Sequence, residues 1–464
     1  MGIGIGFSGG GGLTKPQKDT VTALSNNFRG MFKPYGCQTT VYEAYGASSV
    51  VSKIEAEAPF SRVRIWVWNR GAYGYGGWKF AVAATDKYAV DTNTNAYIPQ
   101  YSGTTNNSIQ TTASTIGWVV ATWGGSGYAH GGFQASNAMY RGESSSGKIY
   151  PSYDYPQSWQ TSKTDQAVCS PICSDWIQIR SRTPNPVQPS GYARPFLLLR
   201  TYRNTGSFPI EGTSAHERLA ATVLTAYSNW TGGNNTYRLH YTRAYTGGDG
   251  VATPTLMPST VGEPSGATDE NYPYIGVEFE YDIPTRAFAI IGDSNSEGYQ
   301  WHVEAIRYVS VPTRPITSAN FGMSSNRSIQ YLSQFDQVFK KGARFTDWLV
   351  PSHSANDVND TDFDLDQTKV QMQRILDEAD SLGVTVWIWT YWRGINTGFS
   401  ANDAQIEEYL EWIRDICTQG RAKLVDIAAN WSRASYTVDS NVHPNATGIA
   451  YCKSVFISAL SANL

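Results

Sequence analysis

Four short polar segments in the C-terminal part of the sequence carry residue types that together can perform nucleophilic catalysis through a tetrahedral intermediate. In chain order they are "GDSN" with Ser294, "NFGMSSN" with Gly322, "SAND" with Asn356 and "HPNATG" with His443. A serine hydroxyl is a weak nucleophile and needs a base within hydrogen-bond reach, and His443 is the candidate base. The tetrahedral intermediate needs donors directed at its oxyanion. The backbone N–H groups of Ser294 and Gly322 and the side-chain amide of Asn356 are the candidate donors.

Each segment taken alone is more typical of an ordinary turn or a helix start than of an active site. What favours a common site is their order along the chain and their position at turns that follow strand-like runs. The other two histidines of this region, His302 and His353, belong to no such motif. We therefore expect both to have structural roles.

The elements that must position these residues form an alternating pattern over residues 284–464. "RAFAIIG" (286–292) is a continuous apolar run, which suits a strand of a parallel sheet that is covered on both faces. The same patterns predict strands at 345–350, 384–390 and 423–428, and helices around Ile329–Val338, around Met372–Ala379 with a stop at Gly383, around Ile406–Cys417 and at 445–460. This alternation predicts a doubly wound α/β domain, in which ligands bind beyond the carboxyl ends of the strands.

The four segments together resemble the SGNH, or GDSL-type, hydrolase family over about residues 284–464. "GDSN" matches its first block with Ser294 as nucleophile, "NFGMSSN" is similar to its glycine block, and "HPNATG" matches its last block with His443 as base. The resemblance implies a flavodoxin-like fold with three layers around a parallel sheet, and ester hydrolysis through an acyl-enzyme without a metal or other cofactor. It also implies that Asp293 stabilises the turn and does not carry a proton.

Two positions depart from the family pattern. The family places an aspartate three residues before the histidine, where this chain has Ser440, and the aspartate here is Asp439. We expect Asp439 to orient the imidazole across a one-residue bulge; a backbone carbonyl in that role, or a weak enzyme, is the alternative. Ser354 stands where glycine is usual in the third block, which is a milder change because Asn356 is the expected oxyanion donor.

Two further residues are candidate substrate contacts because they follow the predicted strand at 384–390. Trp392 and Arg393 lie in "TYWRG" (390–394). Packing in the core is the alternative for Trp392.

The N-terminal part has a different pattern of apolar and polar residues. Residues 40–283 contain alternating strand-like runs, separated by Gly, Asn and Pro clusters, at 60–68, 176–182, 196–202 and 274–282. We expect an all-β, jelly-roll-like sandwich that binds carbohydrate or docks the enzyme onto an assembly. Residues 1–39, glycine-rich and then helix-compatible at 16–28, are expected to form an arm that makes assembly contacts.

Composition narrows the class of protein. Of the 464 residues 16% are charged, against about 25% in ordinary domains, while 13% are aromatic and 43 are glycine. This texture is typical of extracellular β proteins that stack aromatic rings on sugars, although core packing is the alternative for any single ring. The formal net charge of −3 gives no reason to expect a nucleic-acid partner, and no apolar run is long enough to span a membrane.

Five cysteines, an odd number, argue against a full disulfide framework. Cys417 and Cys452 fall on the apolar faces of predicted helices, so we expect them to behave as small buried hydrophobic residues.

The N-terminal sequence shows no signal peptide, yet the surface composition is of the extracellular type. A virion component such as a phage tail protein, made in the cytoplasm and working outside, reconciles the two; a bacterial enzyme exported by another route is the alternative. We expect a homo-oligomer, such as a trimer, or contacts with other virion proteins through the N-terminal arm.

The leading hypothesis is a serine esterase that removes O-acetyl groups from a surface polysaccharide. A second hypothesis is a structural or receptor-binding virion protein whose hydrolase domain is inactive, which the Asp439 and Ser354 departures favour. A third is a lipase or thioesterase that acts on fatty acyl groups.

Overall fold

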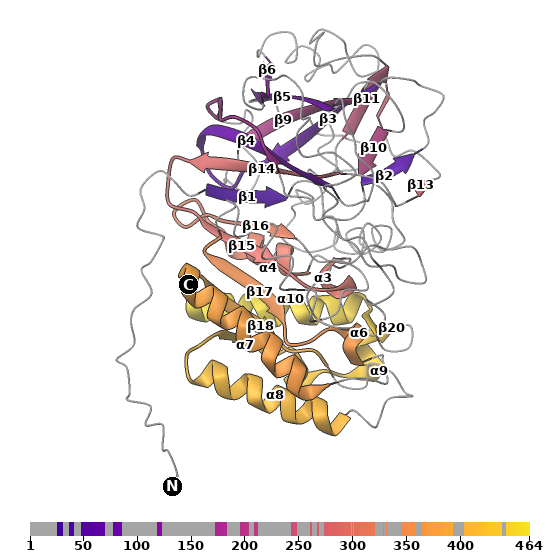
Figure 1. Cartoon of the computed structure of the whole chain (residues 1–464), viewed down its shortest axis with the longest axis vertical. Coiled ribbons are helices and arrows are strands. Elements are labelled where there is room, and N and C mark those ends of the chain that lie inside the picture. The colour runs from indigo at the N-terminus through magenta and orange to yellow at the C-terminus, as the bar shows by residue number, and fades with distance from the viewer. Residues whose placement is uncertain are drawn as a thin grey trace, which may run out of the picture.

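The computed structural model describes about half of the chain, including most of the C-terminal part. The described residues are 26–30, 37–40, 48–69, 78–85, 118–122, 172–182, 195–203, 208–211, 243–247, 260–261, 267–268, 273–297, 299, 301–320, 328, 331, 345–358, 364–392, 403–438 and 442–464. Figure 1 shows antiparallel strands from the N-terminal part lying beside an α/β part that contains the C-terminus.

The α/β part is built on a parallel sheet of five strands in the order β16-β15-β17-β18-β19. Their bounds are Arg286–Ile290 for β15, Ile316–Asn320 for β16, Asp347–Pro351 for β17, Thr385–Trp389 for β18 and Lys423–Val425 for β19. The chain starts near the middle, adds one strand on one side and then crosses to the other side, which is the flavodoxin-like order. The prediction of this fold is confirmed, and the topological switch point lies between the carboxyl ends of β15 and β17.

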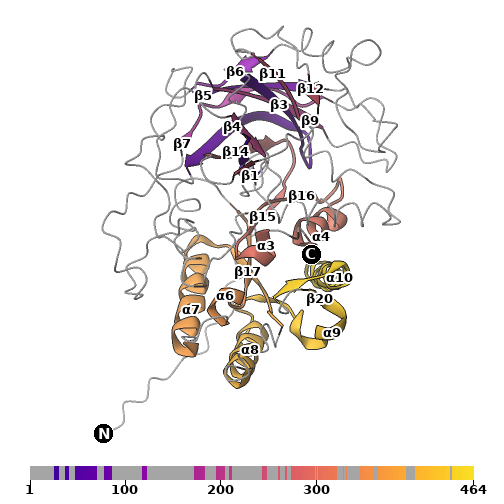
Figure 2. The same cartoon turned by 90° about the vertical axis from the view of Figure 1, so that its right-hand side faces the viewer.

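Helices cover both faces of the parallel sheet. They are α3 (Ser294–Glu297), α4 (Trp301–Val309), α6 (Ala355–Val358), α7 (Leu365–Leu382), α8 (Asp403–Thr418), the 3₁₀ helix η8 (Ala428–Asn430), α9 (Arg433–Tyr436) and α10 (Ala446–Asn463). Alternate residues of β15 point to opposite faces: Ala287 and Ala289 pack toward α7 and α8, and Phe288 and Ile290 toward α4 and α10. Figure 2 shows these two helix pairs on either side of the sheet, which makes three layers.

Local signals set the ends of the predicted helices. Helix α7 begins after Asp364, whose side chain accepts a hydrogen bond from the Gln367 N–H at 3.0 Å, and it ends at Gly383 in the left-handed conformation (φ +66°). Cys452 of α10 is buried and Cys417 of α8 is half-buried, both as free thiols, as expected. Of the helix predicted around Ile329–Val338 only Tyr331 belongs to the described residues, where it is helical and buried. No described helix is long and apolar enough to cross a bilayer.

The described strands of the N-terminal part form antiparallel sheets. One has the order β1-β14-β4-β7 with β8 also on β4, a second has the order β12-β11-β3-β9-β5-β6, and a small third has the order β10-β2-β13. The bounds are β1 Asn26–Gly30, β2 Cys37–Thr40, β3 Ser48–Glu55, β4 Phe60–Asn69, β5 Trp78–Thr85, β6 Val119–Val120, β7 Ile172–Cys173, β8 Ile177–Gln178, β9 Phe196–Arg203, β10 Phe208–Glu211, β11 Arg243–Gly247, β12 Thr260–Val261, β13 Ala267–Thr268 and β14 Pro273–Tyr281.

The two larger sheets share a hydrophobic core. Phe60 and Val277 enter it from the first sheet, and Phe80 and Leu197 enter it from the second. Most of residues 40–283 lie outside the described ranges, so the jelly-roll-like topology and the domain boundaries stay predictions.

Part of the expected N-terminal arm belongs to a sheet instead. Residues 26–28, the end of the helix-compatible stretch at 16–28, lie in β1, which pairs antiparallel with β14. The free edge of β14 offers backbone donors and acceptors, and this pairing outweighs a weak local helix preference. Strand β1 also lies beside β16, the edge strand of the parallel sheet (Figure 1).

Helices α4 and α10 are joined by a buried ion pair. The Lys453 ammonium lies 2.7 Å from Glu304 Oε2, and the two side chains are only 5% and 2% exposed. Burial raises the pKa of the Glu304 carboxyl, and the charge of Lys453 offsets part of that rise. Both side chains are almost fully buried, so the ion pair stabilises both charges, with a smaller contribution from Arg307 to the charge of Glu304.

We expect Lys453→Met to lower the free energy of unfolding by about 3–5 kcal/mol, because it leaves the Glu304 charge buried without its partner. Lys369→Met is the matched control, since Lys369 pairs with Glu408 at 2.8 Å on the surface, with side-chain exposures of 25% and 63%. The control should lose less than about 1 kcal/mol. Urea unfolding followed by tryptophan fluorescence checks both, and equal losses in the two variants would contradict this role of the buried pair.

Candidate active site

The segment after β15 forms a sharp turn that only glycine allows. Gly292 has φ +148°, and a Cβ at this position would lie 2.1 Å from Ser296 Oγ and 3.2 Å from Pro351 Cγ. Ser296 fills this space, and its hydroxyl donates to the Ile291 carbonyl at 3.1 Å. The turn therefore ends the buried strand abruptly and places Ser294 at the start of α3, beyond the carboxyl end of β15.

Ser294 and His443 meet at this end of the sheet. Ser294 Oγ lies 3.1 Å from His443 Nε2, although 149 positions separate them in the chain. His443 is half-buried in β21 (His443–Pro444), which pairs with β20 (Thr437–Val438). The buried Tyr299 ring packs against the imidazole, with ring centroids 5.7 Å apart. This hydroxyl–imidazole contact is the arrangement in which a histidine can take the proton of a serine nucleophile.

The Asp293 carboxylate is fully buried directly before the nucleophile. It accepts hydrogen bonds from four donors: Asn295 N–H at 2.9 Å, the Ser354 hydroxyl at 2.8 Å, Ala355 N–H at 2.9 Å and the Tyr391 hydroxyl at 2.6 Å. Burial raises the pKa of Asp293, and these hydrogen bonds oppose that rise. Two of the donors are backbone N–H groups and two are hydroxyls of buried side chains. The carboxylate therefore connects three loops of the site by hydrogen bonds.

Ser354, which departs from the family glycine, takes part in this arrangement. Its hydroxyl donates to Asp293 and accepts from Asn356 twice, from the backbone N–H at 3.0 Å and from Nδ2 at 3.2 Å. The substitution therefore adds a bridge from the nucleophile turn to the expected oxyanion donor, Asn356. The oxyanion role of that amide stays a prediction.

A second aspartate ties in the segment that follows the glycine block. Asp357 accepts from the Ser354 N–H at 3.0 Å, and also from the backbone N–H and the hydroxyl of Ser328. Gly322 itself lies outside the described residues. The described part of this segment is thus held against the loop after β17, which borders the switch point.

Two other predicted site residues also lie outside the described ranges, Asp439 and Arg393. Val438, directly before Asp439, is paired with His443 in the β20–β21 ladder. Orientation of the imidazole by Asp439 stays a prediction.

Trp392 is placed in the core. It is 1% exposed, and its ring stacks on Trp431 with centroids 4.1 Å apart and an angle of 9° between the planes. A ring packed in this way has no face open to a substrate, so the structure favours the core alternative for this residue.

The two other histidines of this region are buried and have structural surroundings, as expected. The His302 ring bonds to the Ser296 carbonyl through Nε2 at 2.8 Å, and its Nδ1 accepts from the Val303 N–H at 2.8 Å. Burial lowers the pKa of His302 and of His353 to about 3. Both imidazoles are therefore neutral at physiological pH, and the bonds of His302 leave its ring nitrogens engaged.

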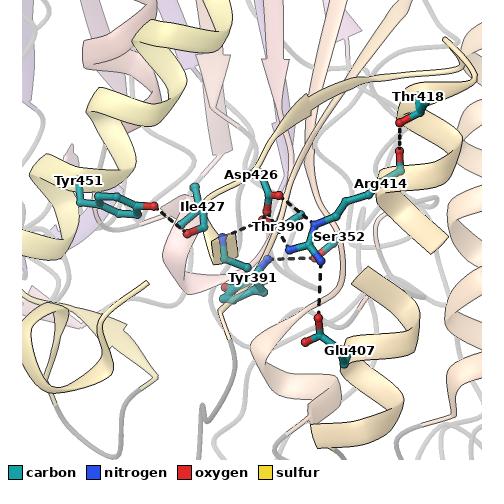
Figure 3. A network of polar contacts seen from close by, with 10 residues as sticks. Ser352, Thr390, Tyr391, Glu407, Arg414, Thr418, Asp426, Ile427 and Tyr451 are labelled. Atoms are coloured by element: carbon teal, nitrogen blue, oxygen red, sulfur yellow. Dashed lines mark hydrogen bonds and ion pairs between the residues drawn. The ribbon is translucent and has the colours of Figure 1, made fainter. Parts of the chain in front are cut away.

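Residues missed by the sequence analysis complete the surroundings of the pair. Asn295 and Tyr391 are fully buried and hydrogen-bonded to each other, with Asn295 Nδ2 2.8 Å from the Tyr391 hydroxyl oxygen. Figure 3 shows how the backbone near Tyr391 is fixed: its N–H donates to Ser352 at 3.1 Å, and the preceding Thr390 hydroxyl donates to Asp426 at 2.8 Å. Asn295 could have been predicted as a site residue because it follows Ser294 directly in the sequence. No motif in the sequence marks Tyr391.

Within the part of the chain that the structure describes, no group of three or more His, Cys, Asp and Glu residues is arranged to hold a metal ion. The chemistry that these residues can perform by themselves is nucleophilic attack by a serine with histidine as base. A serine–histidine pair beyond the carboxyl ends of a parallel sheet, at its switch point, is a site of the serine-hydrolase class.

The comparison with family models gives this class a particular family. Residues 290–450 match the model of the GDSL-like lipase/acylhydrolase family. This part of the chain is a GDSL-like lipase/acylhydrolase domain, so the resemblance drawn from the sequence motifs is confirmed.

Solved structures of three similar proteins each match a part of the chain. A lipolytic protein of the G-D-S-L family from Veillonella parvula has 14% identity and a TM-score of 0.34, with 39% of this chain and 100% of that chain covered. A catalytic mutant of an acetylxylan esterase from Geobacillus stearothermophilus has 16% identity and a TM-score of 0.33, with 38% and 94% covered. A GDSL-like lipase from Bacteroides thetaiotaomicron has 16% identity and a TM-score of 0.32, with 39% and 89% covered. A search among curated proteins found no match to the chain.

We expect Gly292→Ala to lower the free energy of unfolding by about 2–4 kcal/mol, because it adds both backbone strain and a clash with Ser296. Gly420→Ala is the control, since Gly420 has φ +81° and nothing lies within 4 Å of a Cβ added there. The control should lose about 1–2 kcal/mol from backbone strain alone. Urea unfolding measures the loss of stability in both variants. A loss at Gly292 no larger than at Gly420 would show that a Cβ at position 292 does not clash with Ser296.

Proposed function

We propose that the protein hydrolyses carboxylic esters, with Ser294 as nucleophile and His443 as general base. The observation that carries this proposal is the 3.1 Å contact between Ser294 Oγ and His443 Nε2 at the switch point of the sheet. The match of residues 290–450 to the GDSL-like lipase/acylhydrolase family supports the same reaction class.

In the proposed mechanism Ser294 Oγ attacks the ester carbonyl carbon while His443 Nε2 takes the hydroxyl proton. The oxyanion of the tetrahedral intermediate is stabilised by the Ser294 N–H, the Gly322 N–H and the Asn356 amide. His443 then returns the proton to the alkoxide leaving group, which departs as the alcohol and leaves an acyl-enzyme. A water molecule, deprotonated by His443, attacks the acyl carbon, and release of the carboxylic acid restores Ser294.

We further propose that the substrate is an O-acetylated polysaccharide. This step is supported by the composition, which combines few charges with 13% aromatic residues, as is typical of proteins that stack rings on sugars. In this proposal the N-terminal part binds the glycan or docks the enzyme, as a component of a virion. The glycine-rich N-terminal segment then makes contacts with other copies of the chain or with other virion proteins.

A second candidate function is a binding or structural virion protein with an inactive hydrolase domain. The observation that favours it is Ser440 in the place of the aspartate that the family sets three residues before the histidine. An imidazole without an orienting carboxylate is a poorer base.

We expect the full chain to hydrolyse p-nitrophenyl acetate, and Ser294→Ala and His443→Ala each to lower kcat by about 10³-fold or more. The double variant should be no slower than either single variant, because the two residues act as one unit. Ser381→Ala, which changes an exposed serine on α7, is the control and should keep full activity. Folded wild-type protein with no turnover above the Ser294→Ala background would refute the esterase and favour the inactive candidate.

The acyl and sugar parts of the proposal are checked separately. We expect kcat/KM to fall by at least about tenfold from p-nitrophenyl acetate to the octanoate ester, and acetate to be released from an O-acetylated polysaccharide. Release of acetate is measured enzymatically in the wild type and in Ser294→Ala. A preference for the octanoate ester would contradict the deacetylase and favour the lipase alternative.

A further inference from the structure

The side chain of Asn295 connects the nucleophile turn with the loop that carries the base. Asn295 follows Ser294 directly, and its Nδ2 lies 3.3 Å from the carbonyl oxygen of Val442, the residue before His443. The same nitrogen donates its second hydrogen to the Tyr391 hydroxyl oxygen at 2.8 Å. The side chain is 1% exposed, so water does not compete for these bonds.

The hydrogen bonds around Tyr391 fix the orientation of the Asn295 amide. The Tyr391 hydroxyl donates its hydrogen to Asp293 Oδ1 at 2.6 Å, so its oxygen is left to accept from Asn295. Burial and the nearby Asp293 charge hold the pKa of Tyr391 well above its ordinary value, which keeps that hydrogen in place. The NH₂ group, and not the amide oxygen, therefore faces both Tyr391 and the Val442 carbonyl.

These contacts form a closed ring of hydrogen bonds that includes Ser294 and His443. Asp293, Ser294 and Asn295 are consecutive, and the Asn295 N–H also donates to Asp293 Oδ1 at 2.9 Å. The ring runs from Asp293 through Tyr391 and the Asn295 amide to Val442, and returns through His443 to Ser294. Each of the four hydrogen bonds along this path joins residues that are far apart in the sequence, so the path sets where the loop of His443 lies relative to the nucleophile.

We propose that Asn295 and Tyr391 are positioning residues that set the distance between Ser294 and His443 by holding the Val442 carbonyl. The inference rests on the proposed ester hydrolysis, for which a displacement of the base by about 1 Å costs about 10²-fold in rate. Neither residue needs to touch the substrate, so the cost of losing them falls on the chemical step.

The test compares variants that keep the size of each side chain. We expect Asn295→Leu to lower kcat on p-nitrophenyl acetate by about 10–100-fold and to change KM by less than about threefold. Tyr391→Phe removes the hydroxyl that orients the amide and should lower kcat by about 3–10-fold. The double variant should be close to Asn295→Leu alone, because both changes break the same connection.

Tyr451→Phe is the matched control. The Tyr451 hydroxyl donates to the Ile427 carbonyl at 3.2 Å (Figure 3). The substitution therefore removes one tyrosine–carbonyl hydrogen bond near the same end of the sheet and leaves the hydrogen bonds among Asp293, Asn295, Tyr391 and Val442 intact. Its kcat should stay within about twofold of the wild type, and its thermal unfolding shows the cost of losing such a bond to stability alone.

A spectroscopic readout separates this inference from the esterase proposal. The imidazole ¹⁵N signals of the chain's six histidines are recorded, and His443→Ala assigns those of His443. We expect these signals to move in Asn295→Leu and Tyr391→Phe and not in Tyr451→Phe. If the wild type has no turnover but the signals move, the positioning stands and the esterase proposal fails. Unchanged His443 signals in folded Asn295→Leu and Tyr391→Phe, or an unchanged kcat in an active enzyme, would overturn the inference.

Discussion

The buried carboxylate of Asp293 is the group on which the rest of the site depends. A buried charge is costly unless it is fully hydrogen-bonded, and Asp293 meets this demand with donors from three loops. Asn295 donates from the nucleophile turn, Ser354 and Ala355 donate from the loop after β17, and Tyr391 donates from the loop after β18. Since a missing donor leaves the charge exposed to an apolar interior, the carboxylate forces these loops into one arrangement.

The fold brings those loops together in the first place. In the order β16-β15-β17-β18-β19 the direction in which strands are added reverses at β15, so the connections that leave the parallel strands β15 and β17 diverge above the sheet. Ser294 leaves from β15, and Ser354 leaves from β17. The hydroxyl of Ser354 donates to Asp293 and accepts from the Asn356 amide. The serine that replaces the family glycine therefore takes part in the hydrogen bonding of the site.

Much of the α/β part was predictable from the sequence because its signals are local. The apolar run of β15, the stripe of α7 and the end of that helix at Gly383 each reflect burial or backbone conformation along one segment. The bond between Asn295 and Tyr391 was not predictable, since it joins residues 96 positions apart and no motif marks the tyrosine. For Trp392 the sequence left core and substrate contact open, and its stacking on Trp431 is a property of the packed structure.

Labelling with a fluorophosphonate tests the central claim most directly, because this reagent reacts with a serine whose hydroxyl is activated by a neighbouring base. The account predicts one covalent adduct per chain, found by mass spectrometry on the peptide that contains Ser294, and at least about 10²-fold slower labelling in His443→Ala. Folded wild-type protein that gains no adduct on Ser294, or that is labelled equally fast without His443, would contradict it.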